Sequence, residues 1–215
     1  MNRRRRPATP SSALAALGST LALAIAGCAS TPPVHLHTLM PPDPPARVTP
    51  APALPPVLVD AIRIPAQVDQ PQWLVRLGDG SLAALEQERW AAPLRDELHQ
   101  AVVEQLVRRH GVIDVRSGAA APTSYVRVSI DIRRFESIPG REARIEGVWT
   151  LTPNRAGPPA LRCDWLIGEP VEAGMPALAA GHRRALARLV DGIAANLSRV
   201  EARQPAECGL PPNPA

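Results

Sequence analysis

The sequence predicts an α+β domain in which two amphipathic helices pack on one face of a mostly antiparallel sheet. Stretches in the second half of the chain alternate apolar and polar residues, which is the pattern of strands with one buried face. Two other stretches repeat apolar residues at helical spacing. Strands and helices also follow one another in blocks, which favours an antiparallel sheet over a regular succession of parallel strands.

The first half of the domain is expected to contain three strands and one helix. Residues 57–64 predict a strand that is buried on most of both faces. Residues 73–75 and 82–88 predict two further strands around a glycine-containing turn. A helix is expected from Pro93, because the first helical position needs no N–H, to Gly111. Its apolar stripe consists of Leu94, Leu98, Ala101, Val102 and Leu106.

The second half is expected to form a meander and a final helix. Residues 125–132, 145–151 and 161–167 alternate in polarity, and the loops between them contain Gly and Pro. A helix is expected to begin near Pro176, with His182 and the two arginines after it on the solvated side. Its apolar stripe consists of Leu186, Leu189, Val190, Ile193, Leu197 and Val200.

The N-terminus has the parts of a secretory signal. Four arginines at 3–6 precede an apolar run at 13–26, which is too short to span a bilayer comfortably. The run ends in Ile-Ala-Gly-Cys, which resembles the lipobox of bacterial lipoproteins. Residues 1–27 are therefore predicted to be a signal peptide, and Cys28 is predicted to carry acyl chains such as palmitate. The alternative is an ordinary signal peptide with an incidental cysteine.

A proline-rich segment follows the predicted lipid anchor. Residues 29–56 contain ten prolines and little charge, so they predict an extended tether, which together with Cys28 covers 28–56. The folded domain is expected at 57–208, with a short tail at 209–215. After removal of the signal, 20 arginines balance 20 acidic residues, and no basic stripe or aromatic platform for nucleic acid is visible.

The two cysteines of the domain, Cys163 and Cys208, predict a disulfide, because an exported protein meets an oxidising compartment. This bridge would pin the tail after the last helix to a central strand. The histidines are scattered and no CxxC motif occurs, so no metal site and no cofactor are expected. No HExxH, GxSxG or phosphate-loop motif is present, and no enzymatic activity is expected.

Two segments of the chain resemble a known family. The first runs from Ile62 to Arg76 and contains a strand that ends in proline, followed by an Asp-x-Pro-Gln stretch and an arginine. The second is Arg-Trp-Ala-Ala-Pro-Leu, which leads into the first helix. Together they resemble the ABC-type transport auxiliary lipoprotein family (PqiC type), although Gln70 stands where that family commonly has Arg. The matching residues are Pro65, Asp69, Pro71, Gln72, Arg76, Arg89, Trp90 and Pro93.

These motif residues have a structural and a functional interpretation. In the structural one, two prolines bracket a fixed turn, Trp90 caps the core, and Arg89 pairs with Asp69 or Glu86. In the functional one, the same residues form a contact surface for a partner protein. Neither interpretation needs a general acid or base.

The resemblance implies a non-catalytic accessory of an MCE/ABC-type system that transports lipid between membranes and supports the envelope. The expected partners are an MCE-domain protein and ABC transporter subunits, with a homo-oligomer left open. Ala29 follows Cys28 where an Asp would retain enteric lipoproteins, so we expect the periplasmic face of the outer membrane of a Gram-negative bacterium. The alternatives are a regulator of peptidoglycan synthesis and a direct lipid-binding carrier.

Overall fold

A computed structural model describes residues 32–42, 54–117, 122–155 and 159–209. The predicted signal peptide, Cys28, the middle of the predicted tether and residues 210–215 lie outside the described residues. The described residues from Val34 onward belong to one compact unit.

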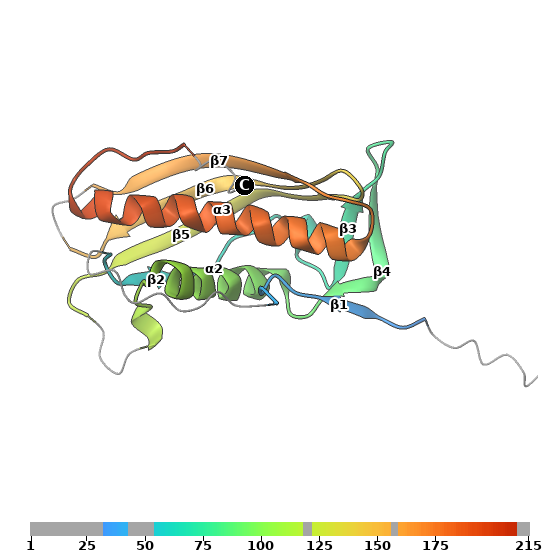
Figure 1. Cartoon of the computed structure of the whole chain (residues 1–215), viewed down its shortest axis with the longest axis horizontal. Helices are drawn as coiled ribbons and strands as arrows, with labels where there is room; N and C mark the ends of the chain where they lie inside the picture. The colour runs from blue at the N-terminus through green and yellow to red at the C-terminus, as the bar shows by residue number, and fades with distance from the viewer. Residues whose placement is uncertain (1–31, 43–53, 118–121, 156–158, 210–215) are drawn as a thin grey trace, which may run out of the picture. The chain divides into compact units, whose positions relative to one another are not determined.

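The domain contains two sheets (Figure 1). The larger sheet has the order β2-β5-β6-β7, in which β5, β6 and β7 form the predicted antiparallel meander. The smaller sheet has the order β1-β4-β3. The strands are β1 (His35–His37), β2 (Val57–Val59), β3 (Gln72–Arg76), β4 (Leu82–Trp90), β5 (Val126–Ile138), β6 (Glu142–Pro153) and β7 (Leu161–Pro170).

The α+β class is confirmed, but both sheets are mixed rather than purely antiparallel. β1 pairs in parallel with β4, and β2 pairs in parallel with β5. Each of these short strands is separated from its partner by a long stretch of chain that contains other elements. A hairpin turn forces antiparallel pairing, whereas a long connection permits parallel pairing.

Two long helices, α2 (Leu94–His110) and α3 (Met175–Glu201), pack against each other, and Figure 1 shows both on the same side of the larger sheet. Pro93 precedes α2, and its carbonyl oxygen accepts bonds from the backbone N–H groups of Asp96 and Glu97. Gly111 ends α2 in the left-handed conformation, with φ of 65°. The predicted apolar stripes of both helices are fully buried.

The close approach of α3 to the sheet depends on Gly181. A Cβ atom at this position would lie 2.3 Å from Cγ1 of Val171 and 2.9 Å from Cβ of Ala143. Both distances are shorter than van der Waals contact, so any larger residue would push the first turns of α3 away from β6.

The predicted strand at 57–64 is shorter than expected. β2 ends at Val59, and the next residue, Asp60, accepts side-chain hydrogen bonds from Arg127 and Ser129 on β5. The chain rejoins β5 at Arg63, whose N–H donates to the Ile130 carbonyl oxygen over 3.1 Å. β5 itself continues beyond the predicted end at 132. A bulge between Ile132 and Arg134 realigns the alternation, so Phe135 again faces the core.

The predicted tether is wrong in its first part, because residues 34–40 join the domain. β1 pairs with β4, and the Ala91 N–H donates to the His37 carbonyl oxygen over 2.8 Å. The side chain of Leu39 is only 1% exposed. Proline content therefore did not prevent this segment from packing, because the strand residues lie between Pro33 and Pro41.

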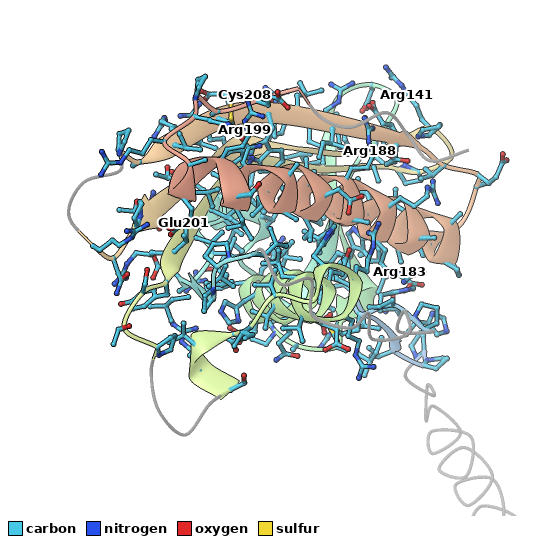
Figure 2. The ribbon with its side chains drawn as sticks, turned by 60° about the vertical axis from the view of Figure 1, so that its left-hand side comes forward. Arg141, Arg183, Arg188, Arg199, Glu201 and Cys208 are labelled. Carbon is cyan, nitrogen blue, oxygen red and sulfur yellow. A yellow bond between two sulfur atoms is a disulfide. The ribbon has the colours of Figure 1, made fainter. Side chains whose placement is uncertain are left out.

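The predicted disulfide is present. Cys163 on β7 and Cys208 in the tail are joined, with their Cα atoms 5.2 Å apart. β7 is an edge strand, not the central strand that the sequence suggested. A second clamp holds the same tail: the Asn196 amide accepts from the Glu207 N–H and donates to the Glu207 carbonyl oxygen, each over 2.9 Å. Figure 2 shows Cys208 beside the C-terminal part of α3.

Candidate functional site: a pocket at the two motifs

A pocket of about 470 Å³ opens where the two sequence motifs meet. One wall comes from the turn before β3, and the other comes from the junction between β4 and α2. We call this feature the motif pocket. Its lining residues are Asp69, Gln70, Pro71, Arg89, Trp90, Ala91, Ala92, Pro93 and Leu94.

Local structure fixes the first wall. Pro65 has the extended conformation and accepts a bond at its carbonyl oxygen from the Val68 N–H, which begins a single 3₁₀ turn at Ala66–Val68. Asp69 follows this turn and forms an ion pair with Arg95 in the first turn of α2. Pro71 then leads into β3, where Gln72 lies opposite Arg89 of β4. The two motifs therefore touch through strand pairing, and Asp69 of the first motif is also held by Arg95, the residue that follows the second motif.

Arg89 does not make the predicted ion pair with Asp69 or Glu86. Its Nε donates to the backbone carbonyl oxygen of Glu86 over 3.3 Å, while Asp69 is paired with Arg95 instead. The Glu86 carboxylate accepts from the Gln72 amide over 3.3 Å. Within the described residues, the half-buried Arg89 guanidinium has no carboxylate partner. It is thus a cation at the edge of a largely apolar pocket.

Trp90 lines the motif pocket and is backed by an aromatic cluster in the core. Trp90 caps the core as predicted, with 6% of its surface exposed, and its ring centroid lies 4.1 Å from that of Trp73. Phe135 approaches Trp90 edge-on at 6.0 Å and stacks on His182 at 4.1 Å. Rigid aromatic contacts of this kind hold the pocket's floor in one position.

His182 is buried, contrary to the prediction that it lies on a solvated face. It is 1% exposed, and its Nε2 forms a hydrogen bond with the Ser137 hydroxyl over 2.8 Å. Ser137 in turn accepts from the Trp73 indole N–H over 2.8 Å. Burial lowers the pKa of His182 to about 3, so its ring is neutral at physiological pH. Because Ser137 is also 1% exposed, this Ser–His pair is closed to a substrate and serves the core.

The remaining motif residues are structural. Arg76 at the end of β3 donates to the Glu136 carboxylate on β5 from both Nε and Nη2, and to the Gly80 carbonyl oxygen over 2.8 Å. These contacts join the smaller sheet to the larger one and close the β3–β4 hairpin. Pro93 both lines the pocket and occupies the N-cap position before α2.

The packed N-terminal segment was missed at the sequence level. The buried carboxylate of Glu97 accepts from the Thr38 hydroxyl over 2.7 Å and from the Leu39 N–H over 2.8 Å. The Arg183 side chain donates to the Thr38 carbonyl oxygen over 3.1 Å. The apolar residues at 34, 36 and 39 are too few to distinguish a strand from a proline-rich linker.

Two histidines of β1 share one carboxylate. His35 Nδ1 and His37 Nε2 lie 2.9 and 2.5 Å from the two oxygens of Glu88. Burial raises the pKa of Glu88, but the hydrogen bonds from His37 and His35 outweigh it, so the pKa lies below its ordinary value. Over the described ranges, no group of His, Cys, Asp and Glu has the arrangement of a metal site. No helix in the same ranges is long and apolar enough to cross a membrane.

A match to a protein family shows which family the chain belongs to. The family described as ABC-type transport auxiliary lipoprotein component matches residues 37–194. The chain belongs to this family. The match includes both motif segments and begins at His37, the last residue of β1.

Solved structures agree on the fold of this auxiliary lipoprotein. A protein of Xanthomonas campestris (family model DUF330) has a TM-score of 0.61 and 23% identity, covering 79% of this chain and 98% of its own. An uncharacterized protein has a TM-score of 0.53 and 17% identity, covering 73% and 98% respectively. At such identities the likeness concerns the fold. No curated protein matches the chain.

Proposed function

We propose that this auxiliary lipoprotein is a non-catalytic component of an MCE/ABC-type system that moves lipid between the two membranes. In this proposal it is anchored at the periplasmic face of the outer membrane through Cys28, and its motif pocket binds the periplasmic end of an MCE-domain protein. Loss of this contact weakens the cell envelope.

The meeting of the two motifs at one open pocket carries the proposal. An arginine with a purely structural role would be expected to pair with a carboxylate of the domain, as Arg76 does with Glu136. Arg89 instead stays without a carboxylate partner among the described residues, beside an apolar lining and over a fixed aromatic base. Such a pocket suits an apolar side chain with a neighbouring acidic group from a protein partner.

The first test is genetic, and the chain offers a matched control. A strain that lacks this protein is expected to become sensitive to detergent, and Arg89→Glu is expected to restore resistance poorly because it repels an acidic partner. Arg162→Glu changes the same charge at an exposed position of β7, away from the pocket, and is expected to restore resistance fully. An unchanged envelope in the deletion strain, or equal rescue by both variants, would count against the proposal.

A further inference from the structure

A second cleft lies between α2 and α3 and shares no residue with the motif pocket. The segment that follows β1 forms its third side. Its volume of about 370 Å³ is in the range of sites that bind small molecules. We call this feature the helix cleft. Its apolar lining consists of Leu39, Pro41, Pro42, Ala180 and Ala187.

Three arginines line the same cleft, Arg109 on α2 and Arg183 and Arg184 on α3. Arg109 forms an ion pair with Asp191 over 3.1 Å, and Arg184 forms one with the buried Glu169 over 3.2 Å. The positive charges of these two arginines are therefore balanced inside the domain.

Arg183 is a cation without a partner of this kind. Its Nη1 donates to the backbone carbonyl oxygen of Thr38 over 3.1 Å, and in the part of the chain that the structure describes it forms no ion pair. Burial lowers the pKa of Arg183, and the neighbouring positive charge of Arg184 lowers it further. The Glu97 carboxylate, which also contacts Thr38, is occupied by the Thr38 hydroxyl and the Leu39 N–H. Figure 2 shows Arg183 at the side of α3 that faces α2.

The helix cleft thus combines an uncompensated positive charge with an apolar lining. A phosphate group would supply the missing negative charge, because guanidinium N–H groups form charge-assisted hydrogen bonds to its oxygens. Glycerol and acyl carbons need only apolar contact, which the prolines and alanines of the cleft provide. A peptide would also need acceptors for its own backbone N–H groups. The polar side chains of the cleft are the three arginines, which only donate, and Gln105, whose Oε1 already accepts from Arg109 over 3.4 Å.

Resting on the lipid anchor of the proposed function, we propose that the helix cleft binds the phosphate of an anionic phospholipid. Arg183 holds the phosphate oxygens, and the first carbons of the lipid lie along Ala180 and Ala187. An anionic headgroup is favoured, because the ammonium group of a zwitterionic lipid would bring a further cation beside the arginines. The lipid comes from the membrane that holds Cys28, since Leu39 follows Cys28 by eleven residues, which span at most about 40 Å.

Titration calorimetry with short-chain lipids tests the proposal. The full mature lipoprotein, purified from its membranes in a non-ionic detergent, is titrated with dihexanoyl phosphatidylglycerol. Dihexanoyl phosphatidylcholine, inorganic phosphate and an acidic peptide of leucine and glutamate are titrated in parallel. Arg183→Gln removes the cation, and Ala187→Phe fills the apolar part of the cleft. Arg162→Gln removes an exposed arginine of β7 and is the matched control.

The proposal expects the phosphatidylglycerol to bind at least tenfold more weakly to Arg183→Gln, at least fivefold more weakly to Ala187→Phe, and with unchanged affinity to Arg162→Gln. Phosphatidylcholine and inorganic phosphate should each bind the wild type at least tenfold more weakly than phosphatidylglycerol does. Equal binding of the lipid to the wild type and to either cleft variant would overturn the proposal. Inorganic phosphate that binds as tightly as the lipid would overturn it in favour of a simple anion site. Binding of the peptide in place of the lipid would overturn it in favour of a protein partner.

Two features of the design separate the helix cleft from other roles. Arg183→Gln also removes the bond to Thr38, whereas Ala187→Phe removes no side-chain hydrogen bond and reports on the cleft itself. Arg89→Glu changes only the motif pocket and should bind the lipid as the wild type does. Absence of lipid binding therefore leaves the docking proposal standing, and failure of docking leaves the lipid site standing.

Discussion

Replacing His182 by Phe should remove a defined part of the protein's sensitivity to acid. The imidazole has a pKa of about 3 in the folded protein, against about 6.5 when it is exposed. Below pH 6.5 the His182 imidazole binds a proton in the unfolded chain but stays neutral in the folded chain. The contribution of this residue to stability therefore falls as the pH falls from about 6.5 to 3. Each pH unit in this window costs about 1.4 kcal/mol.

Between pH 7.5 and pH 4.5, burial of His182 alone should therefore lower the free energy of unfolding by about 2 to 3 kcal/mol. Phe keeps the stacking on Phe135 but cannot take a proton. The variant should be less stable than the wild type at pH 7.5 by about 1 to 3 kcal/mol, because the Ser137 hydroxyl loses its hydrogen bond to the imidazole. At pH 4.5 most of this deficit should disappear. Urea unfolding of the disulfide-intact protein at both pH values measures the two differences.

Ser137→Ala is the control for the hydrogen bond. It removes the partner of the imidazole and leaves the imidazole buried, so its stability should still fall with acid as steeply as that of the wild type. Parallel pH profiles for the wild type and His182→Phe would refute the reasoning, since they would mean that His182 accepts a proton in the folded state.

Three further predictions concern packing. Gly181→Ala should lower the free energy of unfolding by about 1 to 3 kcal/mol in a denaturation curve, whereas Gly78→Ala, where an added Cβ meets nothing within 4 Å, should change it by less than about 0.5 kcal/mol. Replacing both Cys163 and Cys208 by Ser removes a disulfide between residues 45 positions apart. This should lower the free energy of unfolding by up to about 4 kcal/mol, because the unfolded chain gains entropy, and an unchanged denaturation midpoint would contradict this. Leu39→Ala should cost about 2 to 4 kcal/mol and speed hydrogen exchange of the backbone amides that bond to β1, and unaltered exchange would show that this segment does not depend on its buried leucine.

Periodicity predicted the larger part of the fold. Alternation identified the meander of β5, β6 and β7, and helical spacing identified both long helices with their buried stripes. The parallel pairing of β1 and β2 could not be predicted in this way. Each of these strands has three residues, and its partner is chosen by contacts far along the chain, such as that of Leu39 with the core.

The candidate site was predicted as a set of residues but not as a geometry. The two motifs named the residues that line the pocket, yet the ion pair was assigned to Arg89 when it belongs to Arg95. The prediction that His182 lies on a solvated face was wrong for a related reason. Two arginines follow it in the sequence, and only the turn of α3 places it toward Phe135. The polarity of residues adjacent in the sequence does not predict which way a helical side chain faces.

Recovery of a transport partner from native membranes tests whether the motif pocket docks it. The lipidated protein is crosslinked in native membranes, captured and analysed by mass spectrometry, in parallel with Arg89→Glu and Arg162→Glu. The account predicts that an MCE-domain protein or an ABC transporter subunit is recovered with the wild type and Arg162→Glu, and is depleted at least fivefold with Arg89→Glu. Recovery of a peptidoglycan synthase without any transport component, or equal recovery of the transport partner with both variants, would contradict it.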